Sequence, residues 1–215
     1  MQRISVLLLI LTVGLASAED VTSAVGVNGG VNVSHFSGED SELDNTSTDP
    51  RAAFNAGAFL EIGLNRMFSL QPEVQYTRKG ETVKAGSDAL NGTWHVELAY
   101  IEIPLLAKIY FPLSWDTRPF VYAGPFIGFN VNAQTDNIYE VGPLNFDSDT
   151  DLEEDVNPFE AGLSMGTGLR HDIEKLAILL DFRYTLGLSR TFDDETFDEV
   201  YNGVFSGQVG LGIQI

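Results

Sequence analysis

The sequence contains no cysteine, which excludes both a disulfide framework and a thiolate metal site. Basic residues are also scarce, since 12 Lys and Arg stand against 31 Asp and Glu and leave a formal net charge of -19. Nucleic-acid binding requires a basic surface for the phosphates, so this charge excludes it. Beyond the N-terminal segment there is no run of about 18 apolar residues, and no transmembrane helix is expected.

The N-terminal segment has the three parts of a secretory signal peptide. Arg3 supplies a positive charge, residues 6–15 are mostly apolar, and Ala16, Ser17 and Ala18 form a small-residue cleavage site. A membrane anchor is the alternative, but the apolar run is too short to span a bilayer. We therefore predict a signal peptide over residues 1–18, cleaved after Ala18, and one mature domain over residues 19–215. Export, 21 glycines, 11% aromatics and no cysteine favour a β protein of a bacterial envelope.

Residues 100–111, YIEIPLLAKIYF, show the pattern on which the fold prediction rests. The odd positions are all apolar, whereas Glu102 and Lys108 fall on even positions. A period of two is typical of a strand whose faces meet different environments. Pro104 has no N–H for the ladder, so we expect a local bulge there.

Seven further segments of similar length alternate in the same way. They are VGVNGGVNVS (25–34), FNAGAFLEIG (54–63), LQPEVQYT (70–77), VYAGPFIGFNVN (121–132), FEAGLSMGTGLR (159–170), LLDFRYTLGL (179–188) and VFSGQVGLGIQI (204–215). Short connections at 65–67, 112–118 and 171–175 alternate with long ones at 38–50, 80–92, 134–157 and 191–202. Successive antiparallel strands place these two kinds at opposite ends. The sequence predicts an all-β fold, an eight-stranded antiparallel up-and-down transmembrane β-barrel with short periplasmic turns and long acidic extracellular loops.

A soluble periplasmic barrel of lipocalin type, binding an apolar ligand inside, also alternates and is the main competing fold. Its polar face would meet water and be rich in Lys, Glu and Thr. Here the polar face is rich in Gly, Ser and Asn, which suit the crowded interior of eight strands. The apolar face is a nearly unbroken series of Val, Ile, Leu and Phe, as contact with membrane lipid requires. The prediction is an integral protein of the bacterial outer membrane.

The polar face also carries charged residues of both signs, which a barrel would bury in its interior. They are Glu61, Glu73, Glu102, Lys108, Glu160, Arg170, Asp181 and Arg183. Buried charges are costly unless paired, so we predict a hydrogen-bonded interior network. One example of such pairing would join Glu73 and Glu102 with Lys108 and Arg183. We interpret this network as structural filling rather than as a proton path or substrate site.

Four strings carry a resemblance to a known family. They are LQPEVQYTRKG, YIEIPLLAKIYF, FVYAGPFIGFNV and LDFRYTLGL, and together they resemble the PorT-like outer-membrane β-barrel family. The matching positions include Gln71, Glu73, Tyr76, Tyr100, Glu102, Pro104, Lys108, Asp181, Arg183, Tyr184, Gly187 and Leu188. The resemblance implies an eight-stranded integral outer-membrane protein of a Gram-negative envelope and specifies no chemistry. One departure is the last residue, because many outer-membrane barrels end in an aromatic side chain and this chain ends in Ile215.

The four long connections hold 20 of the 31 acidic residues, and the one clear base among them is Lys84. A solvated acidic surface is the first interpretation, and a docking surface for a basic protein partner or for divalent cations is the second. A weak candidate calcium or magnesium site is Asp147, Asp149, Asp151 and Glu153 in the loop 134–157. It is not an EF-hand loop, because Leu152 and Pro158 occupy the positions that need Gly and Glu. No resident cofactor is expected, and the partners would be outer-membrane lipid around a monomer.

We predict that the protein is not an enzyme. The sequence lacks the H-E-x-x-H and P-loop patterns. Three histidines are present: His35 and His95 near the long connections, and His171 in a short turn at the opposite end. The alternative is an outer-membrane lipid- or peptide-modifying hydrolase that uses His35 or His95 with a loop carboxylate.

Overall fold

The computed structural model describes residues 22–37, 46–87, 90–111, 116–141, 144–151, 157–189 and 201–215 of the chain. The predicted signal peptide, 1–18, lies outside these residues. Within the described part, every regular element is a strand. None of the described residues forms a helix long and apolar enough to cross a membrane.

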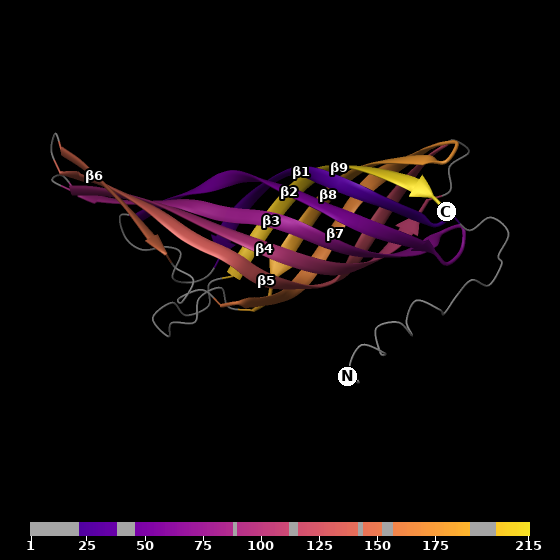
Figure 1. Cartoon of the computed structure of the whole chain (residues 1–215), viewed down its shortest axis with the longest axis horizontal. Helices are drawn as coiled ribbons and strands as arrows, with labels where there is room; N and C mark the ends of the chain where they lie inside the picture. The colour runs from indigo at the N-terminus through magenta and orange to yellow at the C-terminus, as the bar shows by residue number, and fades with distance from the viewer. Residues whose placement is uncertain are drawn as a thin grey trace, which may run out of the picture.

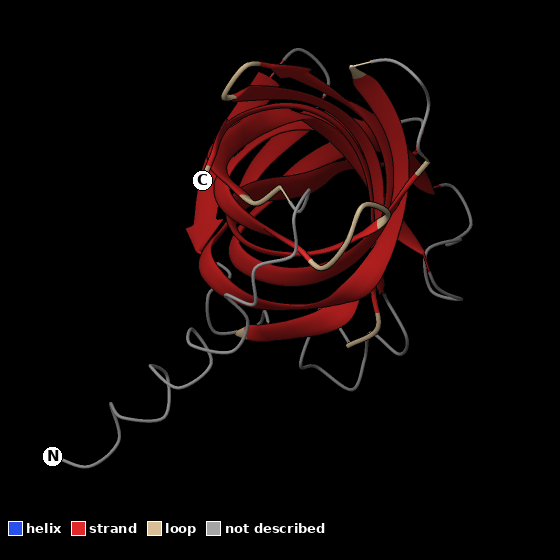
Figure 2. Ribbon diagram, turned by 90° about the vertical axis from the view of Figure 1, so that its right-hand side faces the viewer, coloured by secondary structure: helices blue, strands red, loops and turns tan. Residues whose placement is uncertain are grey.

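Eight antiparallel strands close into a barrel, and a ninth strand extends one wall. The strands are β1 (Ala24–Ser37), β2 (Thr46–Gly63), β3 (Phe68–Ser87), β4 (Leu90–Tyr110), β5 (Thr117–Val141), β6 (Leu144–Asp151), β7 (Phe159–Ile173), β8 (Leu176–Gly187) and β9 (Tyr201–Gln214). The sheet order is β4-β3-β2-β1-β9-β8-β7-β5-β6, and β4 also pairs with β5, so all strands except β6 form a ring. The ring is seen end-on in Figure 2.

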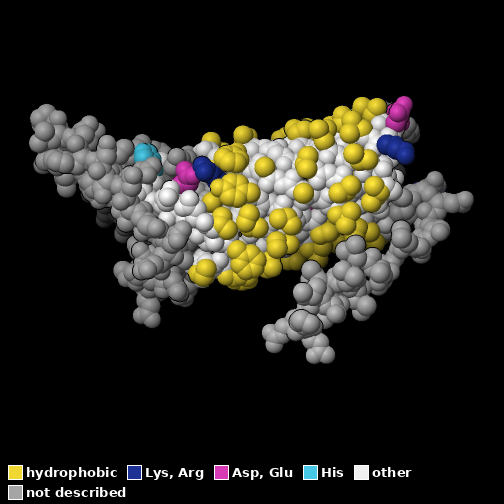
Figure 3. All heavy atoms as spheres, viewed as in Figure 1, with side chains coloured by type: hydrophobic (Ala, Val, Ile, Leu, Met, Phe, Trp, Pro, Cys, Tyr) yellow, Lys and Arg dark blue, Asp and Glu magenta, His cyan; other side chains and the backbone are white. Residues whose placement is uncertain are grey.

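The two faces of the wall differ as the alternation predicts. On β1, Val25, Val27, Val31 and Val33 are exposed, whereas Asn32 and Ser34 are buried. The same division holds around the barrel, and exposed apolar side chains form a broad belt over its outer surface (Figure 3). Such a belt around a closed barrel is the arrangement that a bilayer requires, because no strand edge meets lipid. The predicted fold class, an eight-stranded antiparallel membrane barrel, is confirmed.

All four predicted long loops contain strand residues, since β2 already begins at Thr46 and β9 at Tyr201, and two of the loops are mostly strand, which corrects their boundaries. The β3–β4 ladder continues from Gly80 and Glu97 to Ser87 and Leu90, through most of the region predicted as the loop 80–92. The strand β6 lies wholly within the predicted loop 134–157 and pairs with the end of β5. Figure 1 shows this extension reaching beyond the barrel on the side away from the C-terminus. The apolar alternation ends before these ladders do, because strands that leave the membrane no longer need one lipid-facing side.

Pro104 does not form the expected bulge. Pairing of β4 with β5 keeps one register from Tyr100 to Tyr110, and Pro104 lies opposite Phe126. The register shift falls instead between Ala99 and Tyr100. Ala99 pairs with Asn132 and Tyr100 with Asn130, so the extra residue of this bulge is Val131 of β5. Glu102 and Lys108 therefore keep the same interior face.

Candidate functional site in the barrel interior

The structure places all eight predicted polar-face residues in the barrel interior, each at most 7% exposed. They are Glu61, Glu73, Glu102, Lys108, Glu160, Arg170, Asp181 and Arg183. A ninth charged residue, Lys79, is buried with them at 1% exposure. Together with nearby tyrosines and glutamines these residues form three clusters along the barrel, which we name mid-barrel, short-turn and long-loop.

The mid-barrel cluster is centred on the pair of Arg183 from β8 and Glu73 from β3. Arg183 Nη1 and Nη2 donate to the two oxygens of Glu73 at 2.9 and 3.0 Å. Arg183 Nε donates to the hydroxyl of Tyr122 at 3.0 Å, and that hydroxyl donates to Asp181 at 2.6 Å. The planar guanidinium is suited to this bidentate geometry, which fixes orientation as well as charge.

Two glutamines complete the coordination of Glu73. Gln71 Nε2 donates to Glu73 Oε1 at 2.5 Å, and Gln75 Nε2 donates to Oε2 at 2.6 Å. Each oxygen of the Glu73 carboxylate thus accepts two hydrogen bonds. A buried ion pair offsets the cost of its desolvation only when the remaining lone pairs of the carboxylate are also hydrogen-bonded, as they are here.

A glycine makes room for the tyrosine of this cluster. A Cβ built on Gly166 of β7 would lie 2.4 Å from the hydroxyl oxygen of Tyr122 and 2.4 Å from the backbone oxygen of Phe182. No side chain can occupy that position while Tyr122 keeps its place. The glycine content of the polar face therefore has a specific use here, which is to admit an aromatic ring into a narrow interior.

The short-turn cluster joins Glu61, Arg170 and Asp172. Arg170 Nη1 donates to Glu61 at 2.9 Å, and Arg170 Nε donates to Asp172 at 2.9 Å. The hydroxyl of Tyr110 donates to Glu61 at 2.8 Å. Asp172 also accepts from Arg118 at 2.7 Å, so the cluster reaches the rim of the barrel.

Lys108 is fully buried beside this cluster but is held differently. Its Nζ has no hydrogen-bond partner and lies 3.8 Å from Glu61 Oε2, which also lacks one. The ammonium group lies 4.3 Å from the centre of the Phe120 ring, over its face. A cation–π contact and a loose ion pair thus replace the hydrogen bonds seen around Arg183.

The long-loop cluster has Lys79 at its centre. Lys79 Nζ contacts Glu160 at 2.6 Å and Glu102 at 2.8 Å, and it lies 4.8 Å from the centre of the Tyr100 ring. One lysine therefore bridges two carboxylates that come from different strands, β7 and β4. The cluster ties the walls together near the end from which the long connections leave.

The sequence analysis named Glu73, Glu102, Lys108 and Arg183 as an example of such a network without assigning the pairs, and the structure now gives them. Glu73 pairs with Arg183, but Glu102 pairs with Lys79 instead of Lys108. Glu102 and Lys108 lie six residues apart on β4, a separation of about 20 Å along an extended strand. Two residues on the same face of one strand therefore need not contact each other, and this is why the pairs could not be assigned from the sequence.

Lys79 was missed, although the sequence contained a signal for it. Gln71, Glu73, Gln75 and Thr77 share one face, and Lys79 is the next member of that series. The predicted strand stopped at Thr77, so the alternation was not followed further. Tyr110 and Tyr122 also lie on the interior face by alternation, but their hydroxyl contacts to Glu61 and Asp181 could not be read from spacing.

The structure describes only part of the candidate ion site and of the histidines. Asp147, Asp149 and Asp151 lie on β6, opposite Ile138, Asp136 and Gln134, whereas Glu153 is outside the described residues. Among the side chains that the structure describes, no group of three or more His, Asp or Glu is arranged to hold a metal ion. His95 Nδ1 lies 2.9 Å from the hydroxyl of Thr82, and the side chain of His35 is not described.

Comparison with known proteins gives a family match and a set of similar folds. The family model described as "Outer membrane protein beta-barrel domain" matches residues 17–193. A comparison with curated protein sequences finds no match. The outer membrane protein OprG of Pseudomonas aeruginosa is similar with a TM-score of 0.54 and 10% identity, covering 91% of this chain and 96% of that one. Neisserial surface protein A has a TM-score of 0.44 at 14% identity, covering 86% of this chain and 95% of that one. The attachment invasion locus protein Ail of Yersinia pestis has a TM-score of 0.39 at 12% identity, covering 90% and 99% respectively.

Proposed function

The chain belongs to the outer membrane protein beta-barrel domain family, and on this premise we propose that it is a non-enzymatic barrel of the bacterial outer membrane with an acidic external surface. In this proposal the barrel supports the acidic surface, and the surface binds basic partners. The finer resemblance to PorT-like barrels, carried by segments such as YIEIPLLAKIYF, is part of the proposal and adds no activity.

The observation that carries the proposal is the ion-paired interior. Lys79, Arg170 and Arg183 each hold carboxylates from other strands across the lumen. An eight-stranded barrel has an interior that side chains can fill, and these clusters occupy it at three levels. A lumen filled in this way favours a scaffold over a channel, and it leaves the long connections as the part that meets other molecules.

The long connections supply the chemistry of the proposed surface. In bacterial barrels the long loops face the cell exterior and the short turns face the periplasm. Here the long connections contain 20 of the 31 acidic residues, so they form a strong negative field. We propose a basic protein segment as the partner and divalent cations as competitors for the same carboxylates, with the barrel acting as a monomer.

A binding measurement on the mature chain in nanodiscs of zwitterionic lipid tests this function. A fluorescent lysine-rich peptide is titrated at low and at high salt. We expect binding that weakens as salt rises, because exposed charge pairs are screened. Changing the acidic residues Asp193, Asp194, Glu195, Asp198 and Glu199 to their amides should weaken binding about tenfold. Absence of binding at low salt would contradict the proposal.

A matched control uses carboxylates at the other end of the barrel. Asp116 and Glu174 are exposed beside the short turns, and their change to Asn and Gln alters the charge without touching the long connections. We expect peptide binding to that variant to equal binding to the parent protein. An equal loss of peptide affinity in both variants would show that the peptide responds only to the net charge of the protein, and this would contradict a docking surface on the long connections.

A hydrolase is the second candidate function, favoured by the contact between Thr82 and His95. A hydroxyl paired with an imidazole is the first element of a nucleophilic site. Such a site also needs oxyanion donors and an orienting group. His95→Ala in cells tests this candidate, because a changed lipid or peptide profile would support it and an unchanged profile would exclude it.

A further inference from the structure

The outer wall of the barrel has a groove near the short turns. It has a volume of about 460 Å³ and crosses β3, β4 and β5. Its lining includes Leu64, Phe68, Leu70, Ala107, Ile109 and Ala123. Leu64 and Phe68 flank the turn between β2 and β3, so the groove lies at the short-turn end of the apolar belt.

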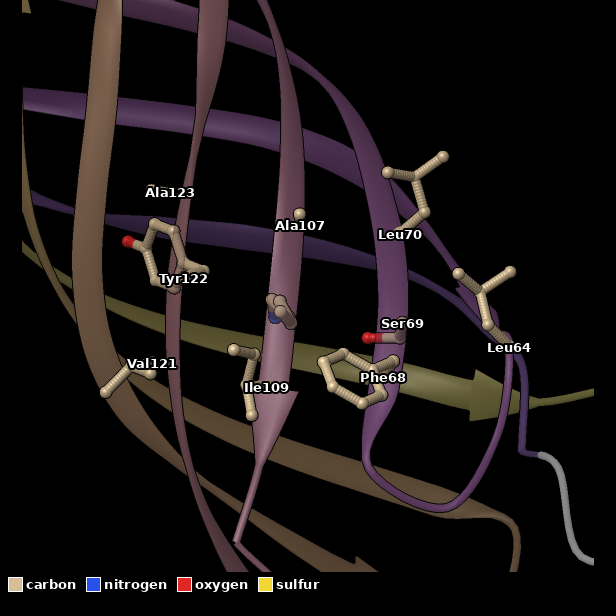
Figure 4. A pocket seen from close by; sticks show the side chains of 10 residues that line it. Leu64, Phe68, Ser69, Leu70, Ala107, Ile109, Val121, Tyr122 and Ala123 are labelled. Atoms are coloured by element: carbon tan, nitrogen blue, oxygen red, sulfur yellow. The ribbon is translucent and has the colours of Figure 1, made fainter.

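The groove arises from two alanines that are neighbours in the sheet. Ala107 of β4 is the register partner of Ala123 of β5, and both are exposed on the outer face. Large side chains border this pair along the same row, since Leu70 pairs with Ala107 and Met165 pairs with Ala123. Figure 4 shows Ala107 between Leu70 on one side and Ala123 on the other.

The next row towards the short turns is also large. Phe68 pairs with Ile109, and Ile109 pairs with Val121. All three side chains are between 37% and 43% exposed, so they project outward as a ridge beside the alanines. A two-strand depression between large apolar side chains has the shape to receive a flexible hydrocarbon chain.

We propose that this groove binds one acyl chain of a membrane phospholipid, in the leaflet that surrounds the short-turn end. The groove is continuous with the exposed apolar belt, which is the surface this barrel presents to lipid (Figure 3). Contiguous exposed apolar surface marks contact with a membrane or a partner, and a depression within it buries more of a chain than a smooth wall does. The inference rests on membrane insertion and is independent of the acidic external surface.

Photocrosslinking of the mature protein in lipid nanodiscs tests the proposal. The probe is a phosphatidylcholine that carries a diazirine in the middle of one acyl chain, and labelled residues are mapped by mass spectrometry. We expect labelling to concentrate at Ile109 and Val121. Labelling spread evenly around the belt would overturn the site, and crosslinks between two protein chains through this face would assign the groove to a second copy instead.

Filling the groove gives the decisive comparison. Ala107→Phe should reduce labelling at Val121 about five-fold, because the ring occupies the space of the acyl chain. Ala58→Phe is the matched control, since Ala58 is also an exposed outer-face alanine but lies on β2 outside the groove lining. The control should leave labelling at Val121 unchanged. Unreduced labelling at Val121 in Ala107→Phe would overturn the proposal. Mobility on unboiled gels shows whether each variant is folded. If Ala107→Phe fails to insert into the membrane, Ala123→Phe is used in its place.

Discussion

Arg183 in the mid-barrel cluster and Lys108 beside the short-turn cluster are both cations buried in a narrow barrel, but their hydrogen bonding differs in completeness. Around Arg183 the guanidinium donates to Glu73, Tyr122 and Asp181, and both oxygens of Glu73 accept two hydrogen bonds. Around Lys108 the ammonium group has no hydrogen bond, and one oxygen of Glu61 has none either. The two regions therefore differ in how much each charge depends on a particular partner.

This difference predicts an unequal division of the stabilising energy. A charge with complete hydrogen bonding leaves several unsatisfied groups behind when it is removed. Removing a charge that makes few hydrogen bonds leaves few groups unsatisfied, so the remaining cost is mainly the lost packing of the side chain. We expect the mid-barrel cluster to be the part of the interior where single substitutions are costly.

The largest effect is expected for Arg183→Met. The change leaves the Glu73 carboxylate buried without its cation, and breaking a buried pair on one side costs about 3–5 kcal/mol. The free energy of unfolding should fall by that amount in a urea titration of the protein in lipid vesicles, followed by the folded band on unboiled gels. A loss below about 1 kcal/mol would remove the contrast between the two clusters.

The control for this prediction is the double variant with Glu73→Gln. Replacing both charges leaves no unpaired ion, so much of the loss in free energy should be recovered. A double variant that is less stable than Arg183→Met alone would show that Glu73 acts through other contacts, such as those with Gln71 and Gln75.

A smaller effect is expected for Gly166→Ala, which tests the fit of the same cluster. The added methyl group would meet the hydroxyl of Tyr122 and the backbone oxygen of Phe182, and overpacking of this kind costs about 1–3 kcal/mol. Gly207→Ala is the matched control, since a Cβ there meets nothing closer than Phe182 at 3.9 Å. We expect urea unfolding to separate the two variants, and equal stabilities would mean that Tyr122 adjusts without cost.

Alternation in the sequence predicts which side chains enter the interior but not which of them meet. The period of two places Glu73 and Arg183 on the interior face, although they lie on strands far apart in the chain. Their contact depends on the shear of the closed barrel, which spacing within one segment does not encode. The same limit explains why the partner of Glu102, which is Lys79, could not be assigned from the sequence.

The alternation in the sequence also could not predict where the strands end or that the outer wall has a groove. Lys79 follows the alternation but lies beyond the end of the predicted strand. The prediction stopped at Thr77 because the next position on the outward face is Arg78, which is not apolar. Ala107 and Ala123 form a groove only because β4 and β5 pair in one particular register. Register is a property of two strands together, so neither segment alone predicts it.

The smallest effect is expected for Lys108→Met, although Lys108 is as deeply buried as Arg183. Its Nζ loses no hydrogen bond, and the contact with the Phe120 ring is replaced by a thioether that also packs well on aromatic rings. Glu61 keeps Arg170 and Tyr110 as partners, so its charge is not left alone. We expect the free energy of unfolding in urea to change by less than about 1 kcal/mol in either direction. A loss as large as that of Arg183→Met would mean that the buried charge of Lys108 stabilises the fold without any hydrogen bond, and hydrogen bonding would then not explain the difference between Arg183 and Lys108.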